Sequence, residues 1–376
     1  MEKRYKTPSN MAKEPLWRLK SFSAADIETA QRILPVLGAK MEQIKVEFSA
    51  EVNAAKQNQQ LMDIIVRHCR KKLYLFHMIG FTPKITLSTQ MPSVEYLLIN
   101  DSEFGPKNTN LSDLFPNVQY LELHNINGTA ANLKNLLKQS FQNLRCVWLD
   151  CSNVFSNRIV RTFLERNTNL TKLILEFGAK GMTRHFFLGI DQEIRKLHNL
   201  TIVPAIPRIP VHQQTFTFQP LLFHELEELN IHGYYDSTFD LFSYLSISNE
   251  NVIRMNIEAS DLNAITMRGI GFYIFLQELT ISADKGLNFK NLIDLVENLT
   301  GLRKIQIIQT GNSDDLRNVD EFLDFIRRFG RMNEFILKDS LPLHYADVLR
   351  NGLDVAVWTV QHRSCGIRVI KTQNIE

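Results

Sequence analysis

Two groups of side chains in this sequence resemble metal or catalytic sites, but neither has the spacing that such chemistry needs. Residues 224–228 (HELEE) begin like the helix of a zinc protease, yet they lack the second histidine that would complete the ligand pair. The same segment falls where the hydrophobic pattern predicts a strand, which would point the side chains in different directions. His68, Cys69 and His77 are close in sequence but follow no ligand pattern, so we interpret them as structural.

Other catalytic signatures are missing from the sequence. It contains no phosphate-binding loop, no dinucleotide-binding glycine pattern and no nucleophile elbow. The acidic pair Asp314 and Asp315 is typical of a solvated loop. We therefore predict a protein that is not an enzyme, with no cofactor, no bound metal and no small-molecule substrate.

Composition narrows the class of protein further. The chain has 376 residues, of which 44% are hydrophobic, and its 43 basic and 40 acidic residues give a net charge of only +3. No basic stripe stands out, so we expect no nucleic-acid partner. Four irregularly spaced cysteines, a polar N-terminus and the lack of a long apolar run argue against secretion and membrane insertion. We expect the protein in the cytoplasm, with the nucleus as the alternative.

One hydrophobic phrase recurs along the whole sequence. It consists of an apolar residue, two variable residues, a second apolar residue, one variable residue and a third apolar residue, as in Val118/Leu121/Leu123. From Val94 to Met332 the copies follow in nine steps of 24 to 30 residues, about 26 on average. Two earlier copies begin at positions 41 and 70, and a weak copy begins at position 200. The result is about 12 leucine-rich repeats.

Helical patterns lie between the copies of the phrase. Apolar residues three and four apart occur at 132–137, 159–164, 291–296 and 319–326. Alternating strands and helices at this length favour a parallel sheet with the helices outside. We therefore predict an α/β fold, a leucine-rich-repeat solenoid with a curved parallel β-sheet on the concave side and helices on the convex side.

The sequence suggests three parts. We expect a flexible basic leader at 1–21, the solenoid at 22–352 and a C-terminal cap at 353–376. Within the solenoid, four prolines at 204–220 favour an irregular loop in place of a helix. In the cap, two apolar segments flank His362–Cys365 and predict a hairpin that closes the open sheet edge.

The first repeats carry many large side chains at positions predicted to lie on the concave face. Because side chains alternate along a strand, the third, fifth and seventh residues of each repeat point to this face. Tyr and Trp dominate binding hot spots, so we predict a protein partner there. The alternative is that aromatics favour strands for structural reasons and lie in the core. The candidate residues are Tyr74, Phe76, Tyr96, Leu98, Tyr120, Glu122, His124, Trp148, Asp150 and Lys172.

The later repeats have a different surface pattern. Their third positions alternate in charge at every step, and their fifth positions are polar. We interpret them as a solvated ion ladder, which adds little stability per exposed pair. The third-position row is Glu228, Arg254, Glu278, Lys304 and Glu334.

The segments 61–70 (LMDIIVRHCR) and 292–305 (LIDLVENLTGLRKI) are similar to those of intracellular F-box leucine-rich-repeat proteins. The resemblance covers roughly residues 22–340 and implies a solenoid that binds a protein on its concave face. It also implies a Skp-type adaptor of a cullin-RING ubiquitin ligase, if an F-box exists upstream. Residues 1–40 contain no Leu-Pro-x-Glu opening and no three-helix span of the F-box kind.

Two functional hypotheses follow from these observations. The first is a protein-interaction scaffold, in its narrower form the substrate-recognition part of an F-box-type ubiquitin ligase. The alternative is a leucine-rich-repeat regulator that inhibits or activates an enzyme such as a small GTPase or a nuclease. The absence of an arginine cluster in the loops favours the scaffold.

Overall fold

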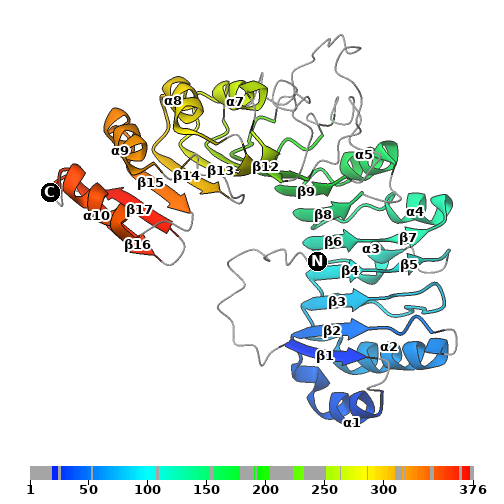
Figure 1. Ribbon diagram of the computed structural model, residues 1–376. Helices are drawn as coiled ribbons and strands as arrows, with labels where there is room; N and C mark the ends of the chain where they lie inside the picture. Colours follow the sequence, from blue (N-terminus) through cyan, green and yellow to red (C-terminus); the bar gives the residue numbers. More distant parts are fainter. Residues whose placement is uncertain are drawn as a thin grey trace. The chain divides into compact units, whose positions relative to one another are not determined.

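The chain forms two compact units, Met1–Asn169 and Leu170–Glu376, in the computed structural model. Each unit is described by itself (Figure 1). The structure describes residues 19–23, 27–51, 54–106, 110–151, 156–177, 190, 193–203, 223–232, 251–262, 264–285, 287–309, 316, 318–338, 343–363 and 366–372.

Unit 1 is a parallel sheet with helices on one side (Figure 1). Its strands, in spatial order, are β1 (Leu19–Ser23), β2 (Gln43–Glu47), β3 (Leu75–Ile79), β4 (Tyr96–Asn100), β6 (Tyr120–His124) and β8 (Cys146–Asp150). Its helices are α1 (Ile27–Leu37), a 3-10 turn (Gly38–Lys40), α2 (Ala55–Cys69), α3 (Leu111–Leu114), α4 (Ala130–Leu136) and α5 (Asn157–Arg166). The short strands β5 (Glu103–Phe104) and β7 (Asn127–Gly128) pair separately.

Unit 2 repeats the same arrangement and ends in an antiparallel hairpin (Figure 1). Its strands, in spatial order, are β9 (Lys172–Glu176), β10 (Asn199–Val203), β11 (Glu228–His232), β12 (Arg254–Asp261), β13 (Glu278–Lys285), β14 (Lys304–Gln309), β15 (Glu334–Lys338), β17 (Gly366–Lys371) and β16 (Trp358–Arg363). Its helices are α7 (Ala264–Gly271), α8 (Phe289–Asn298), α9 (Val319–Arg328) and α10 (Leu343–Gly352).

The recurring apolar phrase builds the core of both units. Val118, Leu121 and Leu123 are all buried, and the equivalent residues of the neighbouring repeats are buried as well. Burying each such side chain contributes about 1.5–3 kcal/mol, so the phrase fixes which face of each strand turns toward the helices. The helices form where the sequence predicted them, with asparagine, serine or threonine caps at the start of α4, α5, α8 and α9. The chain is therefore an α/β leucine-rich-repeat solenoid.

Two repeats lie in a different register from the predicted one. The repeat assigned to Arg70 begins at Leu73, because Leu75 rather than Lys72 aligns with Tyr96 of the next strand. The weak copy begins at Leu197, three residues before the predicted Leu200. In both places apolar residues recur three apart, so the phrase fits two registers. Hydrogen bonding to the neighbouring strand decides between them.

The ends of the solenoid also differ in part from the prediction. β1 begins at Leu19 and pairs with β2, so the last residues of the predicted leader belong to the sheet. Residues 1–18 and the proline-rich segment 204–220 lie outside the described residues. The predicted hairpin forms, with β17 pairing between β15 and β16. No helix in the described part of the chain has the length and hydrophobicity needed to cross a membrane.

A sharp turn follows several strands of unit 1. Gly80, Asp101 and Asn125 occupy equivalent positions and all have positive φ, a conformation open to Gly, Asn and Asp. The backbone N–H of Gly80 donates to the carbonyl of Asn100, and that of Asp101 donates to the carbonyl of His124. Each turn therefore holds the carboxyl end of its strand against the next repeat.

Candidate binding face

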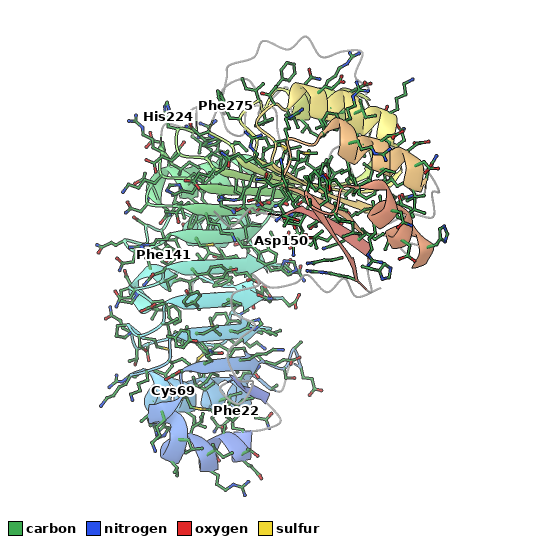
Figure 2. The ribbon with its side chains drawn as sticks, turned by 90° about the vertical axis from the view of Figure 1, so that its left-hand side faces the viewer. Phe22, Cys69, Phe141, Asp150, His224 and Phe275 are labelled. Carbon is green, nitrogen blue, oxygen red and sulfur yellow. The ribbon has the colours of Figure 1, made fainter. Side chains whose placement is uncertain are left out.

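The face of unit 1 opposite the helices carries most of the predicted site. The register places Tyr96 beside Tyr120, and Leu98 beside Glu122. Glu122 in turn lies beside Trp148 on β8. In Figure 2, the labels of Phe141, which precedes β8, and Asp150, which ends it, mark the two edges of the strand stack. The third and fifth positions of β4, β6 and β8 align as predicted, whereas Glu122 and Asp150, which were predicted on an exposed face, are buried.

Three tyrosines form a continuous ladder on this face. The rings of Tyr74 and Tyr96 meet edge to face with centroids 6.0 Å apart, and Tyr96 stacks on Tyr120 at 5.7 Å. All three side chains are half-buried. Such aromatic pairs are worth ~0.5–1.5 kcal/mol beyond their area burial, so the ladder is rigid before any partner arrives.

Glu122 lies in the middle of the face and is only 8% exposed. The Tyr120 hydroxyl donates a hydrogen bond to Glu122 Oε2 at 3.2 Å, and the Asn100 side chain also hydrogen-bonds the carboxylate. Burial raises the pKa of Glu122, because a desolvated carboxylate loses more than these neutral donors return. Burial and the adjacent Glu122 also raise the pKa of the Tyr120 hydroxyl, which stays protonated as the donor.

The carboxylate of Asp150 is also buried, with 6% of the residue exposed, but its partners differ from those of Glu122. Its Oδ2 accepts the backbone N–H of Asn125 at 3.0 Å and lies 3.3 Å from His124 Nδ1. The His124 ring in turn meets Trp148 edge to face at 6.3 Å. Asp150 therefore closes the turn after β6 and fixes His124 against the indole, which makes it a positioning residue of the face.

The prediction for Phe76 is wrong, because this side chain is fully buried. The register shift in its repeat turns Phe76 into the core and brings Leu75, His77 and Ile79 to the face instead. Burial and the nearby Lys45 lower the pKa of His77 to about 4, so this ring is neutral at pH 7. The sequence signal that could have found it is the triplet Leu73/Phe76/Met78, which matches the repeat phrase better than the chosen one.

Tyr74 contacts the tyrosine ladder from a different position than predicted. It precedes β3 rather than lying within it, and Gln43 on β2 donates a hydrogen bond to its hydroxyl. Lys172 is the first residue of β9 and belongs to unit 2. The face described here therefore consists of residues from unit 1 alone.

In the described part of the chain, no group of three or more His, Cys, Asp or Glu side chains could hold a metal ion. Burial raises the pKa of the Cys69 thiol to about 12, so it is neither a ready nucleophile nor a ready metal ligand. In the segment 224–228, His224 and Glu225 lie in a turn and Glu228 begins β11, so no zinc-protease helix forms there.

No protein-family model and no curated protein matches the sequence. Several solved structures are similar to parts of it. An internalin of Listeria monocytogenes is 13% identical, over 78% of this chain and 90% of that chain, with a TM-score of 0.35. A protein of Bacteroides fragilis is 10% identical, over 82% and 78%, with a TM-score of 0.41. The TLR13 chain of a complex with ssRNA13 is 14% identical, over 80% and 52%, with a TM-score of 0.35.

This chain thus spans about half of the TLR13 chain. The leucine-rich-repeat architecture rests on the strand and helix repeat of the chain itself.

The corresponding face of unit 2 carries charge pairs instead of aromatics. Lys304 Nζ lies 3.5 Å from carboxylate oxygens of both Glu278 and Glu334, and Glu334 also pairs with Arg368 of β17. Arg254 pairs with Glu228 at 3.5 Å. The alternating row predicted for this face is confirmed, and β17 extends it by one cation.

Proposed function

We propose that the chain is a protein-interaction scaffold that docks a protein partner on the helix-free face of unit 1. The observation that carries this proposal is the half-buried ladder Tyr74–Tyr96–Tyr120, which continues to Trp148 across Glu122. A partner that covers these rings gains apolar burial without first ordering the side chains. The matching face of unit 2 carries mainly ion pairs and amides that already have partners. Covering such groups contributes little binding free energy.

A paired comparison of variants tests the docking face. Tyr120→Ala combined with Trp148→Ala removes two anchors, and Thr280→Ala combined with Gln306→Ala changes two polar residues of unit 2 at the fifth repeat position, which is the position of Trp148. Full-length protein carrying either pair is compared with the wild type for proteins retained from a cell extract. We expect at least one partner to fall more than tenfold with the first pair and to stay unchanged with the second.

Retention of every partner by the Tyr120/Trp148 variant would contradict the proposal. Circular dichroism and the urea midpoint of each variant show whether the fold is intact, so a loss of binding through unfolding is recognised as such.

The narrower proposal is that the scaffold serves as substrate receptor of an F-box-type ubiquitin ligase. Its support is the similarity of residues 61–70 and 292–305 to that family, and these residues form the end of α2 and most of α8 with the following turn and strand. The described residues between 19 and 40 form a strand, a helix and a 3-10 turn, so an F-box would lie elsewhere in the gene product. Co-purification of a Skp-type adaptor with the full gene product is the expected result, and its absence would reject the ligase role.

A further inference from the structure

Glu122 is a buried carboxylate with no Lys or Arg partner among the described residues, and the one positive group that acts on it is His124 of the same strand, which lowers its pKa against the larger effect of burial. Its hydrogen-bond donors are the hydroxyl of Tyr120 and the amide of Asn100, both neutral groups. Among the described residues, no Lys or Arg side chain pairs with it. Burying a charge without a counter-charge is costly, and proteins seldom keep such a group without a use for it.

Glu334 in unit 2 is a comparable glutamate that does have basic side chains beside it. Glu334 also lies on the helix-free face, with its side chain 13% exposed, but Lys304 and Arg368 both contact its carboxylate. Basic side chains can therefore lie beside a largely buried glutamate on this type of face. Around Glu122 the chain places Tyr120, Leu98 and Trp148 instead.

The three strands β4, β6 and β8 carry acidic side chains but no Lys or Arg. Residues 96–100, 120–124 and 146–150 contain two carboxylates, Glu122 and Asp150, and no Lys or Arg. Asp150 already accepts the N–H of Asn125 and lies beside His124. Glu122 is therefore the charge on these three strands that is left for a group from outside.

The walls around Glu122 favour a planar cation. Tyr120 belongs to a stacked aromatic pair, and Trp148 lies opposite Glu122 on the next strand. A guanidinium stacks on aromatic rings and is more weakly hydrated than an ammonium, so it loses less on entering such a site.

We propose that the partner docked on this face presents an arginine, carried by an extended segment, whose guanidinium pairs with Glu122 between Tyr120 and Trp148. This inference rests on the proposed function and names the chemistry of the partner. The arginine supplies the missing counter-charge, while the residues that flank it cover the Tyr74–Tyr96 end of the ladder.

The probe for this proposal is a random 12-residue peptide library selected on the immobilised full-length protein. Selected peptides are synthesised with each arginine in turn replaced by citrulline, which keeps the shape and removes the charge. We expect peptides whose binding requires Tyr120 and Trp148 to share one arginine. Citrulline at that position, or Glu122→Gln in the protein, should weaken binding about tenfold.

The double-mutant cycle separates this pairing from a general effect. With Glu122→Gln, the change from arginine to citrulline should cost less than twofold, and Glu334→Gln should leave the tenfold effect intact. Peptides that need Tyr120 and Trp148 but bind equally with citrulline overturn the arginine proposal and leave the docking face standing. A selection without any Tyr120- and Trp148-dependent peptide overturns both.

Discussion

Glu122 and Glu334 occupy the same type of face in two units built from the same repeat, yet their surroundings are opposite. Glu334 lies between Lys304 and Arg368, whereas Glu122 has neutral hydrogen-bond donors, Trp148 and Leu98 beside it, and His124 as the one positive group that acts on it. The comparison teaches that the repeat core determines the scaffold and leaves the face free to vary. One face pairs its charges with one another, and the other combines a buried carboxylate with several aromatic rings.

The largest expected effect tests whether the two cores are equivalent. Leu123 and Leu337 occupy the sixth position of their repeats, and both are fully buried. Replacing either by alanine should lower the free energy of unfolding by about 2–5 kcal/mol, through lost burial and the cavity left behind. Urea titration of each variant measures this loss. A loss under 1 kcal/mol at one site alone would show that the two cores are not equivalent.

A smaller loss is expected from Glu334→Gln. This change leaves Lys304 and Arg368 without their shared carboxylate, and the side chain is only 13% exposed. The free energy of unfolding at pH 7 should fall by about 1–2 kcal/mol. Thermal unfolding at low and high salt provides the measurement, and the difference from the wild type should shrink as salt screens the pairs. An unchanged midpoint would show that the ladder contributes nothing.

The same substitution in unit 1 should act in the opposite direction. Glu122→Gln keeps the shape and a hydrogen-bonding oxygen but removes a carboxylate whose ionisation is disfavoured by burial. The free energy of unfolding at pH 7 should rise by roughly 1 kcal/mol, as is common where function requires a strained group. Urea titration beside Glu334→Gln tests the pair directly. Destabilisation by Glu122→Gln would mean that the carboxylate is satisfied within the fold.

The smallest expected effect is the pH dependence of the stability that Glu122→Gln adds. The pKa of Glu122 is raised in the folded protein, so the folded state holds this proton more tightly than the unfolded chain does. The penalty from the charge is present above the folded pKa and disappears as the pH falls below about 4.3, the ordinary value for glutamate. The stability difference between Glu122→Gln and the wild type should therefore be smaller at pH 4 than at pH 7, and the decrease should begin as the pH falls through the folded pKa. A difference independent of pH would rule out charge as its cause.

Most of the fold could be predicted from the sequence, because the core residues of each repeat can be recognised within that repeat alone. Each copy of the phrase buries its own three apolar residues, so Val118, Leu121 and Leu123 could be assigned to the core without knowledge of their neighbours. The rows of β4, β6 and β8 followed from alternation alone. The prediction failed at Phe76, where apolar residues three apart allow two registers, and one of the two reverses the faces of the strand.

The charge balance of the face could not be predicted in the same way. The sequence predicted Glu334 in a row of alternating charge and Glu122 among large apolar side chains, but it did not show which groups contact either carboxylate. Only the tertiary structure brings Arg368 from the returning hairpin to Glu334, and only the packing of Tyr120, Asn100 and Trp148 desolvates Glu122. Core membership depends on hydrophobic periodicity, which is written in the sequence. The energy of a charge depends on what surrounds it in space, and that is decided by residues far apart in the chain.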